Sequence, residues 1–114
     1  MPVKYKLYKG IPMIEIKGNF DLTNSHDIKE KLNHLLSENS ISDIILDLTN
    51  LKFVDSSAIG VIVKLALKLK ESQGRIVIVN TSQNIKKLFT MSNLNSIVNI
   101  VENFDIAVSS FSKV

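Results

Sequence analysis

Continuous apolar runs alternate along this chain with segments in which apolar residues recur every three or four positions. Two of the runs, Ile44–Leu48 and Ile76–Val79, are short and bounded by polar residues. This pattern is typical of strands that are covered on both faces of a sheet, and the β-branched residues of the second run favour a strand further. The expected strands are about Val3–Tyr8, Met13–Lys17, Asp43–Asp47, Ile76–Val79 and Ile97–Ile100.

Helical spacing of apolar residues predicts about four helices among these strands. The first is capped by Thr23 or Asn24 and runs to about Leu36, with its apolar residues on one face. The second begins at a pair of serines. The last three helices are expected at about Ser56 to Gly74, Gln83 to Met91 and Phe104 to Phe111.

The order of these elements predicts the fold class. A turn signal at Lys9-Gly10-Ile11-Pro12 makes the first two strands an antiparallel hairpin. Later strands are separated by helices, which implies right-handed crossovers and parallel pairing. We therefore expect one α/β domain over residues 1–114, with a mostly parallel sheet of about five strands, an antiparallel N-terminal hairpin at its edge and about four helices.

Composition excludes several classes of function. The chain has 114 residues, no cysteine and no apolar run that approaches the length of a membrane span, which is about 18 residues. A soluble, cytoplasmic protein is expected. The net charge of +3 does not indicate nucleic-acid binding, because Arg75 is the one arginine and the lysines are dispersed from Lys4 to Lys113.

The segment Asp55-Ser56-Ser57 lies where a strand gives way to the second helix. Serine and aspartate are preferred helix caps, so a purely structural role is one interpretation. The first turn of a helix also favours a phosphate group, because its backbone N–H groups lack partners and the dipole is positive there. No Gly-x-Ser-x-Gly motif is present and both histidines, His26 and His34, lie on another predicted helix. A catalytic serine is therefore not predicted, nor is a metal site or a cofactor.

The second helix carries more apolar residues than one sheet contact requires. Its main stripe is widened by Ala58, Val61 and Leu65. Either a partner protein or the neighbouring helices of the same chain cover this additional surface. The main stripe consists of Ile59, Ile62, Val63, Ala66 and Leu69.

Two motifs resemble a known family. Asp55-Ser56-Ser57-Ala58-Ile59-Gly60 follows an Ile-Leu-Asp-Leu strand, as in the anti-sigma factor antagonists, which are small bacterial STAS-domain proteins. Gly18-Asn19-Phe20-Asp21 matches the Gly-x-Leu-Asp pattern at the end of that family's second strand. The order of later elements also agrees, whereas Ala58 stands where the family most often has glycine.

The resemblance implies a STAS-type fold and a switchable binding protein that is not an enzyme. Ser56 would be the phosphorylation site, and Ser57 a neighbour. The unphosphorylated form would bind an anti-sigma factor that is also a serine kinase, and so free a sigma factor; phosphorylation would release it, and a serine phosphatase would reset it. Together with the wide apolar helix, this predicts partner contacts at Asp21, Asp55, Ser56, Ser57, Ala58, Ile59, Val61 and Leu65.

Two other functions stay open at this point. One is a STAS scaffold or ligand-binding module without a switch, which the alanine at position 58 makes more credible. The other is a receiver-like protein phosphorylated on an aspartate with Mg²⁺, built from Asp47 with Asp21 and Asp55. The initial hairpin argues against a receiver, since receivers begin with a strand that leads to paired acids.

Overall fold

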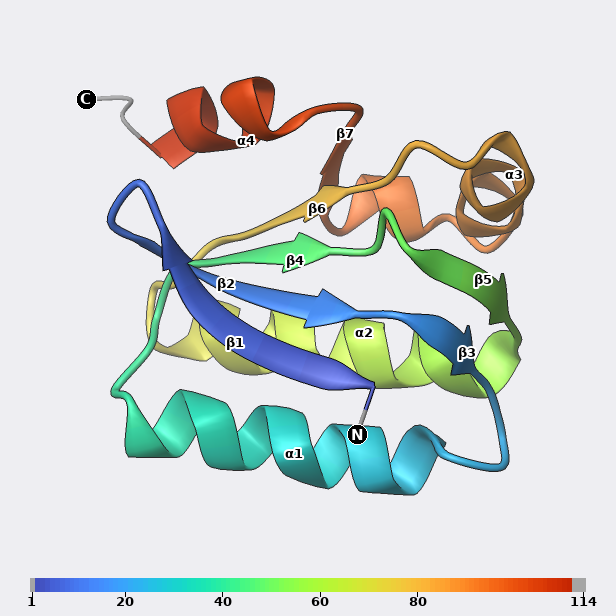
Figure 1. Ribbon diagram of the computed structural model, residues 1–114, viewed down its shortest axis with the longest axis horizontal. Coiled ribbons are helices and arrows are strands. Elements are labelled where there is room, and N and C mark those ends of the chain that lie inside the picture. The colour runs from blue at the N-terminus through green and yellow to red at the C-terminus, as the bar shows by residue number, and fades with distance from the viewer. Residues whose placement is uncertain (1, 112–114) are drawn as a thin grey trace.

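A five-stranded mixed sheet organises residues 2–111, which are the residues described by the computed structural model (Figure 1). Its strand order is β1-β2-β4-β6-β7, in which β1 and β2 are antiparallel and all other pairs are parallel. This confirms the predicted fold class. The strands are β1 (Val3–Tyr8), β2 (Ile11–Ile16), β4 (Ile44–Asp47), β6 (Ile76–Val79) and β7 (Asn99–Val101).

Helices cover both faces of this sheet. Figure 1 shows α1 and α2 on one face and α4 on the other, with α3 at one end. The central strands β4 and β6 are buried along their whole length, which explains their continuous apolar runs. The helices are α1 (Ser25–Glu38), α2 (Ser56–Glu71), α3 (Gln83–Met91) and α4 (Phe104–Phe111).

The two faces have separate cores of unequal size. The larger core lies between the sheet and the α1–α2 layer and includes Phe20, Ile62 and Phe89, all fully buried. The smaller core lies under α4 and is centred on Ile45 and Ala107. Arg75 holds the end of α4 in place, since its guanidinium donates to the carbonyl oxygen of Ser110 and lies over the ring of Phe111.

A second, two-stranded sheet extends the fold beyond the ends of β2 and β4, and the sequence analysis did not predict it. β3 (Gly18–Phe20) pairs in parallel with β5 (Leu51–Val54). β3 follows β2 after a single residue, because Gly18 has a φ of 79° that redirects the chain. β5 has two exposed central residues, Lys52 and Phe53, and so lacks the apolar alternation that reveals a strand.

The predicted element boundaries differ from the observed ones at a few positions. β7 begins at Asn99, two residues later than expected, because Leu94–Ser96 forms a 3₁₀ turn that buries Leu94. Asn24, one of the two expected caps, directly precedes α1, and this helix continues to Glu38. α2 ends at Glu71, before Gly74.

Candidate functional site

The small β3–β5 sheet brings the two sequence motifs together. Phe20 and Val54 are paired at the ends of these parallel strands, so the residues that follow them, Asp21 and Asp55, leave the sheet at the same edge. The backbone N–H of Leu22 donates a hydrogen bond of 3.0 Å to Oδ2 of Asp55. Residues 33 positions apart in the sequence are therefore joined directly at the start of α2.

Asp55 is the N-cap of α2. One of its carboxylate oxygens, Oδ1, accepts hydrogen bonds from the backbone N–H groups of Ser57 and Ala58, at 3.0 and 3.4 Å. The hydroxyl of Ser57 donates to the same oxygen. The pKa of Asp55 lies below its usual value, and the largest cause is the hydrogen bond from the Ser57 hydroxyl. The backbone N–H groups of Leu22, Ala58 and Ser57 lower the pKa further, and burial opposes this shift without cancelling it. Asp55 is thus a fixed negative charge at neutral pH.

Asp21 organises the turn that precedes α1. Its Oδ1 accepts hydrogen bonds from both the backbone N–H and the hydroxyl of Thr23. Asn24 closes the turn, since its Oδ1 accepts from the N–H of Asp21 at 3.0 Å and its Nδ2 donates to the carbonyl oxygen of Asn19 at 2.8 Å. The carboxylates of Asp21 and Asp55 are therefore both engaged in holding loop backbone.

The two serines of the motif have different environments. Ser56 is the first residue of α2 and is exposed, and its hydroxyl makes no hydrogen bond to any residue between 2 and 111. Ser57 is half-buried, and its hydroxyl is held by Asp55. A group that approaches from solvent can reach Ser56 directly, whereas Ser57 would first have to give up its bond to Asp55.

The burial of two residues on α2 contradicts part of the predicted partner surface. Ala58 is 0% exposed and Leu65 is 4% exposed, so their side chains cannot contact a partner. Ala58 lies in the main core, and Leu65 lies against α1 beside Leu32. Ile59 and Val61 are half-buried. The rest of this chain, rather than a partner, therefore covers Ala58 and Leu65.

Three exposed residues close to Ser56 in the sequence, or joined to its neighbour Asp55, were omitted from the predicted contact list. Leu22 is 77% exposed and contacts Asp55 through its backbone, and Phe53, three residues before Ser56, is 51% exposed. Gly60 is exposed and follows Ser56 by four residues, on the same side of the helix. The sequence feature that could have indicated Leu22 is its place as an apolar residue within the polar turn Asp21-Leu22-Thr23-Asn24. We call Leu22, Phe53, Ser56 and Gly60 the Ser56 surface.

Neither Asp47, the central acid of the receiver alternative, nor the two histidines form a site in the part of the chain that the structure describes. Asp47 is buried, and its carboxylate accepts hydrogen bonds from the backbone and hydroxyl of Thr49. His26 and His34 are exposed, and His34 pairs with Glu38 at 3.4 Å. Among residues 2–111 no three His, Asp or Glu side chains are arranged to hold a metal ion. No helix in the same range could cross a bilayer.

Comparison with known proteins identifies the family of this chain. The sequence matches the STAS domain family over residues 3–107, and the chain belongs to this family. An anti-sigma F factor antagonist from Paenibacillus polymyxa is 23% identical over 103 residues, which cover 90% of this chain and 88% of that protein.

Two solved structures illustrate the same fold. The crystal structure of a candidate anti-sigma factor antagonist from Thermotoga maritima has a TM-score of 0.90 at 21% identity, and the match covers 97% of this chain and 95% of the other. The Bacillus cell fate determinant SpoIIAA in its phosphorylated form has a TM-score of 0.71 at 20% identity, with 97% and 99% covered.

Proposed function

We propose that this protein is an anti-sigma factor antagonist controlled by phosphorylation of Ser56. The unphosphorylated form binds an anti-sigma factor that is also a serine kinase, and the sigma factor is set free. Phosphorylation of Ser56 releases the antagonist, and a serine phosphatase restores it. The observation that carries the proposal is the exposed hydroxyl of Ser56, which has no hydrogen-bond partner among residues 2–111 and lies beside a second serine whose hydroxyl donates to Asp55.

In this function the chain is a substrate and a binding module, not an enzyme. The kinase transfers the γ-phosphoryl group of ATP to Oγ of Ser56; the hydroxyl proton passes to a base of the kinase, and ADP leaves. Asp55 is not that base, because its carboxylate already accepts hydrogen bonds from Leu22 and Ser57. Its role is to hold the first turn of α2 in a fixed position.

The electrostatics of the site support a switch that acts on binding and spares the fold. A phosphoryl group adds about −1.5 to −2 charge units at the N-terminus of α2, where the helix dipole offsets part of the repulsion from Asp55. A partner packed over Ser56 would have to bury this charge. Changing a complex from 99:1 bound to 1:99 requires about 5.5 kcal/mol of differential affinity, a magnitude that a buried interfacial charge reaches and a charge on the rim does not.

The alanine at position 58 is compatible with this function. Its methyl group faces the core and is fully buried, so it adds no bulk to the surface on which a kinase would sit. What a kinase meets near Ser56 is Gly60, whose position on α2 has no side chain, and the apolar groups of Leu22 and Phe53.

The proposal is tested by incubating the protein with ATP and the anti-sigma factor kinase of the same cell, and mapping the phosphate by mass spectrometry. Wild type and Ser57→Ala should each gain one phosphate, on Ser56, and Ser56→Ala should gain none. Phosphate on another residue would exclude the proposed switch. Stable binding of the kinase without any phosphorylation would favour a STAS scaffold that does not switch.

A further inference from the structure

The two serines at the start of α2 differ in what holds their hydroxyl groups. The hydroxyl of Ser57 donates to Oδ1 of Asp55, and the backbone N–H of Ser57 donates to the same oxygen at 3.0 Å. A hydrogen bond to a carboxylate is about twice as strong as one between neutral groups. Ser56 is exposed, and its hydroxyl has no such bond to any residue between 2 and 111. Asp55 therefore restrains one hydroxyl of the pair and leaves the other to solvent.

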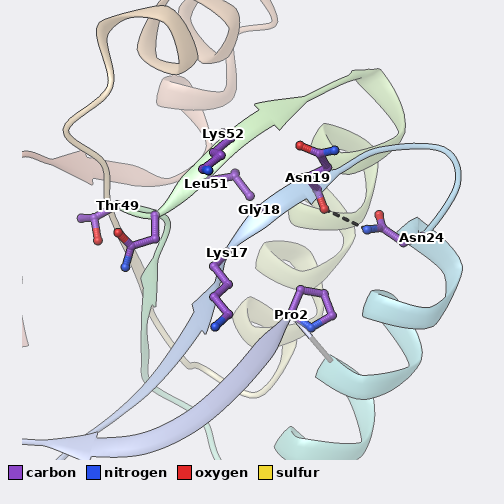
Figure 2. Close-up of a pocket in the computed structure, with 9 residues that line it drawn as sticks. Pro2, Lys17, Gly18, Asn19, Asn24, Thr49, Leu51 and Lys52 are labelled. Carbon is purple, nitrogen blue, oxygen red and sulfur yellow. Dashed lines mark hydrogen bonds between the residues drawn. The ribbon is translucent and has the colours of Figure 1, made fainter.

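Asp55 is itself held by the turn that precedes α1. Its second oxygen, Oδ2, accepts a hydrogen bond of 3.0 Å from the backbone N–H of Leu22. Asn24 fixes this turn, since its Nδ2 donates to the carbonyl oxygen of Asn19 at 2.8 Å, as the dashed line in Figure 2 shows. The carboxylate can therefore turn away from Ser57 only by giving up its bond to Leu22 as well.

We propose that Asp55 determines the specificity of the phosphorylation, because it withholds the hydroxyl of Ser57 and so directs the kinase to Ser56. This inference rests on the proposed function. In a transfer to either serine, the bond between the γ-phosphorus and the bridging oxygen of ATP breaks, a bond from that phosphorus to the serine Oγ forms, and the hydroxyl proton passes to a base of the kinase. The hydroxyl of Ser57 must first leave Asp55, whereas that of Ser56 is available at once.

A carboxylate beside a hydroxyl can also act as a general base and activate it. Two features of this pair argue against activation. The hydrogen bond from the Ser57 hydroxyl is the largest of the causes that lower the pKa of Asp55, and a weak base is a poor acceptor for a proton. Ser57 is also half-buried. Restraint and activation predict opposite results when the carboxylate is removed.

The test is the ratio of phosphate on Ser57 to phosphate on Ser56, measured by mass spectrometry after incubation with ATP and the anti-sigma factor kinase. Because both serines belong to one chain, a change in the affinity of the kinase cancels from this ratio. Asp55→Ala should raise the ratio by about tenfold or more, since a bond to a charged group is lost. Asp55→Asn keeps an oxygen that can accept from the hydroxyl and should raise the ratio less.

Ala58→Gly is the matched control, because it loosens the first turn of α2 and leaves the bond between Ser57 and Asp55 in place. Its ratio should stay that of wild type. If wild type is phosphorylated on Ser56, the role of Asp55 is overturned by an unchanged or lower ratio in Asp55→Ala, or by an equal rise in Ala58→Gly. Wild type without phosphate on Ser56 would instead contradict the proposed function itself.

A second measurement needs no kinase, and so covers the case in which Asp55→Ala no longer binds it. The three-bond couplings of the serine β protons report whether a side chain keeps one χ1 rotamer. In wild type Ser57 should keep one rotamer and Ser56 should sample several, whereas both serines should sample several in Asp55→Ala. Averaged couplings at Ser57 in wild type would show that its hydroxyl is not restrained, and would overturn the inference.

Discussion

Two substitutions in the first turns of α2 should change stability in opposite directions, although their positions are only two residues apart. Ala58→Gly removes a methyl group that is fully buried in the main core. Gly60→Ala adds a methyl group at an exposed helical position, where a Cβ would meet no other atom within 4 Å. The first loses packing and helix propensity, whereas the second gains helix propensity without a clash.

The size of each effect follows from these environments. Replacing alanine by glycine within a helix costs about 1 kcal/mol, and the loss of one buried methyl group costs about 0.8 kcal/mol more. Ala58→Gly should therefore destabilise the protein by about 1.5–2 kcal/mol, slightly less if the first turn frays. Gly60→Ala should stabilise it by about 0.5–1 kcal/mol.

Urea unfolding followed by circular dichroism measures both changes. With a slope of about 1–3 kcal/mol per molar urea for a small protein, the midpoints of the two variants should be separated by roughly 1 M or more, with wild type between them. If Ala58→Gly were as stable as wild type, the methyl group would not be packed in the core. If Gly60→Ala were destabilised, the space beside Gly60 would not be open.

Three further predictions concern the site. Gly60→Ala should weaken binding of the kinase despite its greater stability, because the new methyl group lies one helical turn from Ser56. Ala58→Gly should bind the kinase normally when it is folded, and calorimetry measures both affinities. Leu22→Ala/Phe53→Ala should lower kinase affinity without a change in stability above about 0.5 kcal/mol per exposed residue. Leu67→Ala, at a position on α2 as exposed as Phe53, is the control, and equal losses of affinity in both variants would contradict a role of the Ser56 surface in binding. The lowered pKa of Asp55 means that its charge stabilises the fold above the unfolded value, near 3.8, and that this stabilisation is lost as pH falls through the folded pKa. The difference in unfolding free energy between wild type and Asp55→Asn should therefore shrink only in that acidic range. Urea titrations at several pH values measure this difference, and a decrease already near neutral pH would contradict the prediction.

The main sheet was predictable because its central strands, β4 and β6, are buried on both faces. The apolar run of β6 and the alternation of strands with helices were sufficient to predict the parallel pairing, and the turn signal around Gly10 predicted the hairpin. The β3–β5 sheet was not predictable, because it is short and because Lys52 and Phe53 face solvent. Its existence depends on a turn at Gly18 and on pairing between residues far apart in the sequence.

The candidate site was predictable in its motif and only partly in its surface. Asp55 as a cap follows from local sequence preference, and the structure has it as the N-cap of α2. Whether an apolar residue of α2 is buried depends on where α1 packs, which no local pattern reports. Leu65 was therefore predicted at the surface although it is buried, and Leu22 was left out although it is 77% exposed.

The most direct test of the proposed phosphorylation switch is the affinity of the anti-sigma factor kinase for this protein before and after phosphorylation of Ser56. Calorimetry at one salt concentration measures both affinities. If the phosphate is buried in the complex, the affinity should fall by several hundredfold to about ten-thousandfold, while the melting temperature of the free protein changes little. Equal affinity for the two forms would show that Ser56 lies outside the region that the kinase covers.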